Sequence, residues 1–466
     1  MERQKMKDIN IWGRLSLDKK VSWIIIFAIS AITFVAIWYG DIYLTYRHSL
    51  FLIDCLLDGN IFDYYSLVNE QVSVAVYLMP LYIVFAIWNI PTWIATRVFY
   101  IPEDAVGCLL WTKLIVVFFL IVAVFFIYHI CKIMRYKEIE YILFFFLSSL
   151  FVYCPVIATG QYDIIEIVFM LWGLYFYLID GELSTRAVLF FSIAISMKIF
   201  AFFVYLILIL IEEKRVLHIL WKILEGFGVS VITIIPFLSG YISTSSQFNS
   251  DMGSRLFTIT LPGGNVPISI FWSGFIIICV VAYLSKVNDI RKKFVLWSWL
   301  GAIFWLIFFV FVQGAYPYWI IWMIPFLAFV IGGNLKLKKI NILLETIMEI
   351  ALITIMSYIY YWVYLQPGAF SKLIFKDVFI NSGYEGIGLN AVLDKLGLGF
   401  SFSAIGAACL ICGMIFLTIN NPWKEILHED VEDDVILAEK TMRILRSGLC
   451  ILYFVVTLLF NIDLFK

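Results

Sequence analysis

The feature that most constrains this chain is a series of long apolar runs that recurs along its whole length. A helix needs about 20 consecutive apolar residues to cross the hydrocarbon core of a bilayer, and several of these runs approach or reach that length. The strands of a membrane β-barrel would instead show short segments of alternating polarity. We predict membrane spans at 21–39, 106–130, 139–157, 164–180, 216–237, 269–285, 294–312, 318–333, 343–364, 401–420 and 447–462.

Composition supports this interpretation. Of the 466 residues, 63% are hydrophobic and only 14% are charged, whereas a soluble domain is nearly half apolar and about a quarter charged. The run at 21–39 is too long for a signal peptide and lacks a small-residue cleavage site, so we expect it to be retained as the first span. The predicted fold class is therefore all-α, a polytopic transmembrane bundle of about 11–13 membrane helices, with residues 1–466 as a single integral membrane domain.

One apolar segment, 187–211, has a lysine at its centre. A single span would bury Lys198 at mid-bilayer, which is costly. Two short helices that meet at Lys198 would enter the membrane partway and return. This second arrangement raises the count to 13 hydrophobic segments.

The distribution of positive charge decides between the two arrangements. With two short helices, 24 of the 33 Lys and Arg residues lie on the same side as the N-terminus, and such an excess marks the cytoplasmic face. The N-terminus is then cytoplasmic and the C-terminus external. The external segments are 41–104, 158–163, 239–268, 313–318 and 366–400.

Two of the connecting segments are long. We expect external loop 41–104 to contain one or two interfacial helices, because it is aromatic and broken by three prolines; a hairpin through the membrane is the alternative. The cytoplasmic connector 421–446 is acidic and then basic, which is typical of a solvated helix.

Several function classes lack support in the sequence. Net charge is −1, which gives no indication of a nucleic-acid partner. The eight cysteines form no framework, and Cys409 and Cys412 are interpreted as small residues of a membrane helix. Walker, Rossmann and zinc motifs are absent from the sequence.

Acidic residues gather just after the first apolar run, in "YGDIYLTYRHSLFLIDCLLDGNIFDYYS". Asp41 comes directly after the predicted span, where partial desolvation raises the pKa of a carboxyl and makes it a better base. The alternative is a polar residue that ends a helix. Three further aspartates, Arg47 and His48 in the same loop favour a site.

A second polar cluster, "CPVIATGQYDIIEI", falls in a very short external turn between two spans. The turn keeps Gln161 and Asp163 close to the membrane. Asp163 could serve only as a helix N-cap, but Gly160, Gln161 and Asp163 together exceed what a cap requires. We therefore treat the turn as part of a candidate site.

Two cations could serve an anionic ligand on the external side. Lys198 suits a lipid phosphate, unless it snorkels or pairs with a carboxylate. Arg255 could fork onto phosphate oxygens or be an ordinary loop residue. The aromatic turn around Tyr316, Tyr318 and Trp319 could anchor the chain at the interface or stack on a sugar. Carboxylates beside cations at a membrane surface suit glycosyl transfer from a polyprenyl-phosphate sugar.

The order of these elements resembles the GT-C superfamily of polytopic glycosyltransferases, in particular the branch with the first GPI mannosyltransferase and bacterial polyprenyl-phosphate-dependent enzymes. The resemblance covers most of the chain. Asp41 follows the first span as the family's catalytic aspartate does, but Asp41-Ile-Tyr lacks a second carboxylate. The further matching elements are "LLDGNIFDYY", "VYLMPLY" with one proline fewer than the family, "ATGQYD", "ISMKIF" and "AYPYWIIWMIPFL".

The resemblance implies inverting transfer at the external face, with Asp41 as the base. It implies that Lys198 and Arg255 hold the lipid-linked phosphate. It further implies sugar-hydroxyl contacts from Gln161 and Asp163, and that the cavity is lined by His48 and Tyr77. The expected partners are a polyprenyl-phosphate sugar donor, a glycan or lipid acceptor and membrane lipid. We assign no metal ligands, and a divalent cation stays open as a cofactor.

Two other functions stay open at this stage. A flippase or transporter for lipid-linked oligosaccharide predicts polar residues spread through several spans and internal repeats, which the sequence does not show. A polysaccharide polymerase would be expected to have more external arginines. The absence of an N-x-S/T sequon and the richness in Ile, Phe and Lys favour a bacterial cytoplasmic membrane.

Overall fold

The chain folds into a helical bundle with a smaller group of helices at one end. The structure is a computed structural model and describes residues 15–263, 266–359, 365–367, 393–424, 426 and 435–461. In these ranges the strands are limited to two short antiparallel pairs, β1 with β4 and β2 with β3. The all-α fold class is therefore confirmed for the described residues.

In the described part of the chain, six helices are long and apolar enough to cross a membrane, which makes the chain a multi-pass membrane protein. They are α2 (Leu17–Ala36), α7 (Val106–Ile133), the continuous stretch Val216–Ser245 formed by α13 (Val216–Ile234) and the first part of α14 (Leu238–Ser254), α16 (Ile290–Phe311), α21 (Gly399–Asn420) and α22 (Val435–Asn461).

Two sharply bent helix pairs bring this number to eight if each pair is one span. The first pair is α5 (Met79–Trp88) with α6 (Ile90–Arg97), bent by 66°. The second is α8 (Ile139–Ser148) with α9 (Leu150–Val152) and a π-helical turn to Ala158, bent by 53°. The total of 11–13 crossings stays a prediction.

The remaining helices complete the bundle. Helices α12 (Phe200–Glu212) and α15 (Ile270–Leu284) pack against α16 and against each other. Helices α10 (Asp163–Asp180) and α11 (Thr185–Met197) pack against each other and also contact α12. Helices α17 (Ile324–Gly333) and α18 (Lys338–Ile359) lead toward the C-terminal pair α21 and α22. The largest buried side chains of the bundle's interior include Trp297, Trp305 and Trp322.

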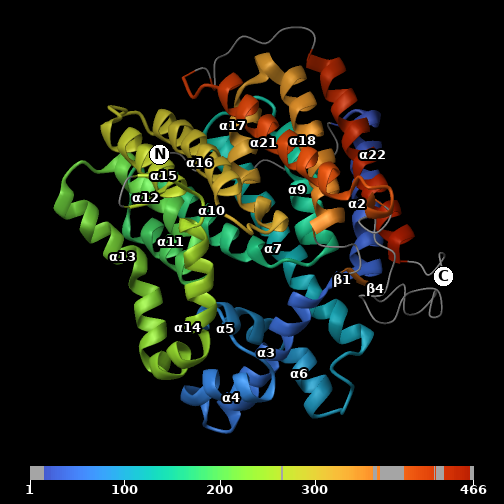
Figure 1. Ribbon diagram of the computed structural model, residues 1–466, viewed down its shortest axis with the longest axis vertical. Coiled ribbons are helices and arrows are strands. Elements are labelled where there is room, and N and C mark those ends of the chain that lie inside the picture. Colours follow the sequence, from blue (N-terminus) through green and yellow to red (C-terminus); the bar gives the residue numbers. More distant parts are fainter. Residues whose placement is uncertain are drawn as a thin grey trace, which may run out of the picture.

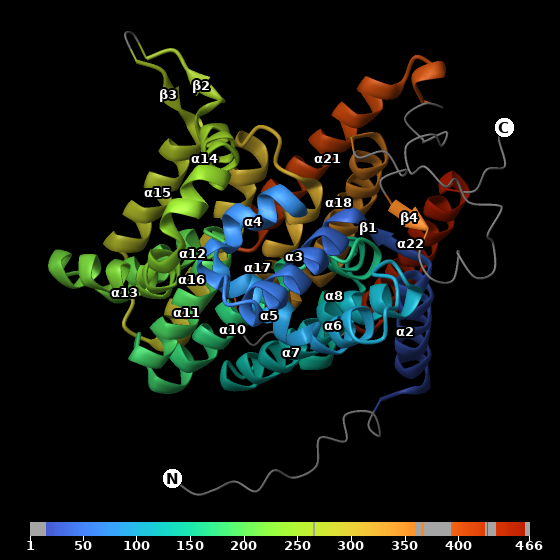
Figure 2. The same cartoon turned by 90° about the horizontal axis from the view of Figure 1, so that it is seen from below.

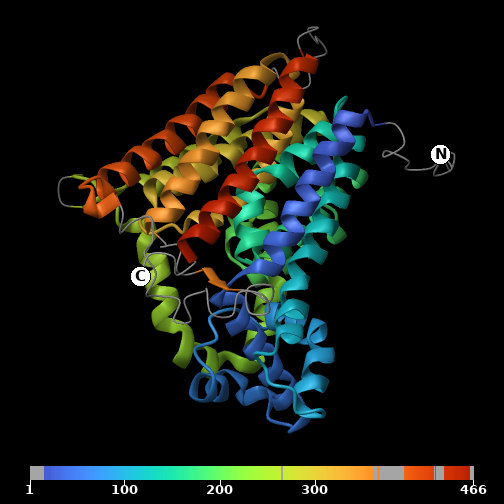
Figure 3. The same ribbon diagram turned by 90° about the vertical axis from the view of Figure 1, so that its right-hand side faces the viewer.

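We call the group at one end the cap, defined as α3 (Gly40–Leu57), the 3₁₀ turn Ile61–Asp63, α4 (Tyr64–Gln71), α5, α6 and α14. Figures 1 and 3 show these helices together at one end of the long axis, and Figure 2 looks onto them from that end. The Tyr65 and Tyr241 rings are 5.1 Å apart, and Ser245 Oγ donates to Ala75 O at 2.8 Å. Residues from loop 41–104 and segment 239–268 therefore pack on each other, a contact that sequence order does not reveal.

Residues 41–104 form four α-helices, α3 to α6, where one or two were expected, and their position at the membrane interface stays a prediction. The segment predicted as loop 239–268 contains most of α14, because Pro236 sits in a 3₁₀ turn, Ile235–Phe237, that continues directly into the helix. The hairpin β2 (Thr260–Leu261) and β3 (Ile268–Ser269) follows.

Two parts of the bundle have features that the sequence did not predict. The span expected at 139–157 is broken at Ser149, whose backbone is extended, and the free Leu150 N–H donates to Glu349 Oε1 at 2.8 Å. The helix expected to be solvated within 421–446 is exposed along one face where it is described, with Lys440 and Ile444 at the surface. Its other face is buried, and there Glu439, Arg443 and Arg446 pair with charges on other helices. Such partners from distant segments cannot be read from local polarity.

Candidate active site

Asp41 lies where the bundle meets the cap. Strand β1 (Ile37–Tyr39) ends α2 and pairs antiparallel with β4 (Leu365–Pro367), and Asp41 follows in the first turn of α3. Its Oδ2 accepts a hydrogen bond from Gln161 Nε2 at 3.0 Å. Burial raises the pKa of the Asp41 carboxyl, while Gln161 and Lys198 partly oppose that shift. Asp41 is therefore poised as a stronger base than an exposed aspartate.

The turn before α10 supplies the partners of this carboxylate. Gly160 has a φ of 72°, which glycine adopts without strain, and it redirects the chain into α10. Asp163 Oδ1 pairs with Lys198 Nζ at 2.6 Å, and its Oδ2 accepts from Trp322 Nε1 at 3.1 Å. Asp163 is the first helical residue rather than an N-cap. Both of its oxygens are occupied, so Asp163 orients Lys198 and Trp322.

Lys198 lies at a helix break, as the charge distribution predicts. Its backbone is extended, with φ −152° and ψ 126°, between α11 and α12. The ammonium lies over the Phe200 ring at 5.2 Å and the Trp319 ring at 5.3 Å. Because an ammonium has three N–H donors and only one is used by Asp163, Lys198 keeps donors for a ligand.

Arg255 is connected to this group through aromatic rings. Its Nη1 donates to Gly314 O at 3.0 Å, and its guanidinium lies 5.6 Å from the Tyr316 ring centroid. Tyr316 in turn meets Trp319 edge-on at 5.0 Å. The predicted aromatic turn therefore lies between the two predicted cations. Tyr318 stacks on Tyr316 at 5.2 Å.

Tyr77 lies close to the carboxylates and His48 lies deeper in the cap. The Tyr77 ring meets Tyr162 edge-on at 5.7 Å, and burial raises the pKa of Tyr77 with further contributions from Asp163 and Asp41.

His48 is buried, bonds to Ser73 Oγ at 2.9 Å and lies about 10 Å along α3 from Asp41, given 1.5 Å per residue. Burial lowers the pKa of His48 to about 4, so the ring is neutral at pH 7.

Sequence reasoning missed Lys113 on α7. This lysine is 2% exposed, and its Nζ donates to the carbonyls of Phe34 at 2.9 Å, Ile37 at 2.5 Å and Ala158 at 3.2 Å. It ties the end of α2 to the turn before α10, and so fixes the segments that carry Asp41 and Gln161. The available signal was a lone lysine inside an apolar run, the same signal that singled out Lys198.

Glu166 was also missed, although it falls in the stretch around Asp163. It is fully buried, one helical turn after Asp163, and neither carboxyl oxygen has a hydrogen-bond partner. Its spacing of three residues from Asp163 places both carboxyls on one face of α10. The junction thus holds three acidic side chains, one glutamine and one lysine, which we call the junction cluster: Asp41, Gln161, Asp163, Glu166 and Lys198.

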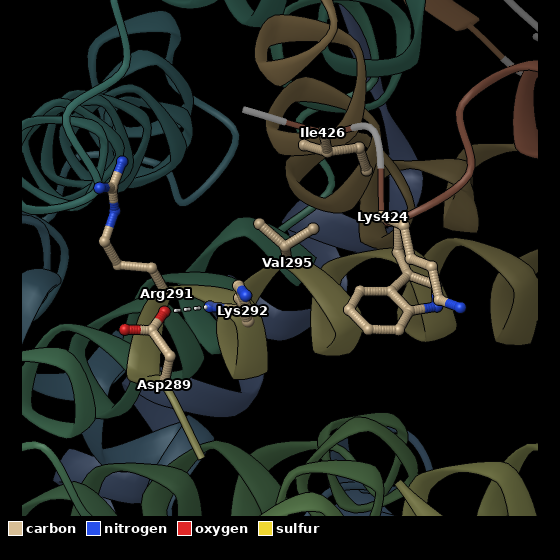
Figure 4. Close-up of a pocket in the computed structure, with 7 residues that line it drawn as sticks. Asp289, Arg291, Lys292, Val295, Lys424 and Ile426 are labelled. Carbon is tan, nitrogen blue, oxygen red and sulfur yellow. Dashed lines mark hydrogen bonds between the residues drawn. The ribbon is translucent and has the colours of Figure 1, made fainter. Parts of the chain in front are cut away.

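Figure 4 shows a separate cavity of about 610 Å³ at the start of α16. Its lining includes the basic residues Arg291, Lys292 and Lys424. Asp289 Oδ1 accepts a hydrogen bond from the Lys292 backbone N–H at 3.0 Å, and Arg291 Nη2 donates one to Met134 O at 2.7 Å. Helix α16 has 22 residues, so about 33 Å separates this end from the end near the aromatic turn, at 1.5 Å per residue. The cavity is therefore not part of the junction cluster.

Within the described residues no group of three or more His, Cys, Asp or Glu side chains is placed to hold a metal ion. Comparisons with protein-family models, curated proteins and solved structures found no match to this chain.

Proposed function

We propose that this chain is a polytopic membrane glycosyltransferase that moves a sugar from a polyprenyl-phosphate donor to a glycan or lipid acceptor, as the resemblance to the GT-C superfamily implies. One observation carries the proposal. A carboxyl with a raised pKa, Asp41, shares a cluster with the ion pair of Asp163 and Lys198, where an apolar helical bundle meets a cap. A lipid-linked sugar phosphate needs both an apolar surface and polar groups at this level.

In the proposed reaction, Asp41 takes the proton of the acceptor hydroxyl. The hydroxyl oxygen attacks the anomeric carbon, forming the new glycosidic bond on the face opposite the phosphate, and the bond to the phosphate oxygen breaks with its electron pair. Anomeric configuration is therefore inverted. General-base catalysis of this kind contributes about 10²- to 10⁴-fold to a rate.

Lys198 and Arg255 would stabilise the departing polyprenyl phosphate. Positive groups placed where negative charge develops are a large source of rate enhancement. Asp163 takes a different role from the sugar contact that the resemblance implies, because both of its oxygens are already bonded. It would hold the Lys198 ammonium toward the phosphate.

The proposed topology places the N-terminus in the cytoplasm and the cap outside, with 11–13 membrane crossings. It rests on the excess of Lys and Arg in the connectors on the N-terminal side. A bacterial cytoplasmic membrane is the proposed location.

The test offers synthetic polyprenyl-phosphate sugars to the purified protein, one sugar at a time, and compares wild type with Asp41→Asn. The expected result is donor turnover by wild type that falls by about 10²-fold or more in the variant. The matched control is Asp63→Asn, an exposed carboxylate of the cap, which should behave as wild type. Full turnover by Asp41→Asn would remove the proposal's central residue.

A transporter for lipid-linked oligosaccharide is a second candidate, and one observation favours it. Glu345 and Glu349 on α18 and Arg446 on α22 are buried inside apolar helices, and charges at such depth often mark transport pathways. Flux of a labelled lipid-linked oligosaccharide in proteoliposomes, lost in Glu349→Gln with the fold intact, would support this candidate.

A further inference from the structure

The cap contains a second polar cavity, of about 440 Å³, that is separate from the junction cluster. Asp54, in the outer half of α3, and Asp58, directly after the end of α3, line one side of it. Asp54 lies 13 residues after Asp41, which is about 20 Å along α3 at 1.5 Å per residue. The volume is within the range of about 300–1,000 Å³ that small-molecule sites occupy.

A network of ion pairs holds the back wall of this cavity. Arg97 forks onto Asp54, with Nη2 to Oδ2 at 2.9 Å and Nε to Oδ2 at 3.1 Å. Arg97 Nη1 also donates to Glu103 at 2.9 Å, and Arg47 Nε donates to the other oxygen of Glu103 at 3.2 Å. Four charged side chains from α3, α6 and the following loop are thereby fixed relative to one another.

An indole, two free polar side chains and the apolar side chains of Phe51, Leu57 and Val72 also line the cavity. Trp93 donates its Nε1 to Asp54 Oδ1 at 2.6 Å, which fixes the orientation of its half-buried ring. Asp58 and Gln71 also line the cavity, and both are exposed. They remain available to a ligand.

The charge balance restricts the class of ligand. Three carboxylates and two guanidinium groups line the cavity, and both Arg47 and Arg97 already donate to carboxylates. An anion would therefore meet a net negative wall. A metal ion is not favoured either, since no metal-binding group of acidic side chains was found in the described ranges.

A neutral ligand with many hydroxyl groups fits this lining. Carboxylates accept hydrogen bonds from sugar hydroxyls, and the amide of Gln71 can both accept and donate them. The indole of Trp93 offers an apolar wall beside these groups. We propose that this cavity is a carbohydrate-binding site that holds neutral, non-reacting sugar units of the acceptor glycan. The acceptor assignment rests on the proposed glycosyltransferase function, whereas carbohydrate binding is measurable without it.

Such a site would act by raising the local concentration of acceptor. A glycan bound in the cap cavity remains close to Asp41 between transfers. The binding of its acceptor end at Asp41 then becomes an intramolecular event. The site would then favour longer acceptors over single sugars.

The test measures binding of short neutral oligosaccharides of mannose, glucose and galactose to the full-length protein by isothermal titration calorimetry. The protein is kept in a zwitterionic detergent, because a maltoside headgroup would compete. We expect saturable binding that weakens about tenfold in Asp58→Ala and in Gln71→Ala. Each change removes one hydrogen bond to the sugar, and such a loss corresponds to about a tenfold change in affinity. Uronate-containing oligosaccharides should bind more weakly than neutral ones.

Three controls make the outcome decisive. Asp63→Asn, in the cap but outside the cavity lining, should bind as wild type, and thermal unfolding confirms that each variant is folded. Asp41→Asn should lose transfer while it keeps oligosaccharide binding, which separates the two proposals. Absence of saturable binding by wild type, or wild-type affinity in both Asp58→Ala and Gln71→Ala, would overturn the inference even if transfer is observed.

Discussion

Two regions of this molecule bury charged side chains, and they do so in different ways. The junction cluster sets three acidic groups against Lys198 and leaves Glu166 without a hydrogen-bond partner. The second region, which we call the C-terminal cluster, sets four acidic side chains against four basic ones: Glu140, Glu345, Glu349 and Glu439 with Lys19, Lys338, Arg443 and Arg446.

The difference indicates different tasks. In the C-terminal cluster the guanidinium of Arg446 contacts both Glu345 and Glu349 and donates to Phe145 O at 2.9 Å. Balanced, multiply bonded charges fasten helices α2, α8, α18 and α22 together. The junction cluster instead leaves Glu166 without a hydrogen-bond partner and Lys198 with free N–H donors, and charged groups with incomplete partners of this kind are typical of functional sites.

The largest expected effect is a loss of folding stability when a charge of the C-terminal cluster is removed. Arg446→Met leaves Glu345 and Glu349 buried without their cation, and breaking a buried ion pair in this way costs about 3–5 kcal/mol. Thermal unfolding in detergent should therefore show a strongly destabilised protein. The donor turnover per folded molecule should stay near that of wild type.

The triple variant Arg446→Met, Glu345→Gln and Glu349→Gln provides the control. It removes all three charges together, so it should recover much of the lost stability. A single Glu349→Gln change that abolished transport or turnover without destabilising the protein would contradict a purely structural role for the C-terminal cluster.

The next effect concerns turnover. Lys198→Met removes the cation that we assign to the departing phosphate, and turnover of the lipid-linked donor should fall by about 10²-fold. Lys198→Arg keeps the charge and should retain more activity. Lys286→Met, an exposed lysine in a connector, is the matched control and should have no effect. Equal turnover in Lys198→Met and wild type would place the phosphate elsewhere.

Much of the fold followed from the apolar runs and the distribution of Lys and Arg. The break at Lys198 was predicted because a mid-membrane lysine is costly. The break at Ser149 was not, because the groups that stabilise it, Glu345 and Glu349, lie about 200 residues away. A local sequence pattern shows that burying a charged group is costly, but it does not identify the distant residue that pairs with this group.

The same limit applies to the candidate site. Asp41, Gln161, Asp163 and Lys198 were selected for their chemistry, and the structure brings them together. The pairing of β1 with β4 beside Asp41 joins segments more than 300 residues apart. A short strand pair of this kind leaves no periodic signal in the sequence, so it could not be predicted.

A smaller effect is a shift in pH dependence. Because Asp41 must lose its proton to act as a base, kcat/KM should rise with pH through the pKa of Asp41, above the usual value of about 3.9. Gln161→Leu removes a hydrogen bond that lowers this pKa, so the acidic limb should move to higher pH. Asp163→Asn removes a like charge, so the limb should move to lower pH. Shifts in the same direction would contradict Asp41 as the titrating base.

The smallest expected effect tests the imbalance of the junction cluster itself. A charged carboxylate buried without a partner is costly, so Glu166→Gln, which stays neutral and keeps the shape, should change the free energy of unfolding by less than about 1 kcal/mol.

Donor turnover of Glu166→Gln should stay within about threefold of wild type, a difference of less than 1 kcal/mol in activation free energy. Glu166 is expected to be neutral because it is buried without a partner, so its replacement by the neutral Gln leaves the charge of the junction unchanged. If turnover in Glu166→Gln instead fell as far as in Asp41→Asn, Glu166 would carry a proton in the reaction. The two clusters would then differ further, because every acidic group of the junction cluster would take part in the reaction, whereas those of the C-terminal cluster would stabilise the fold.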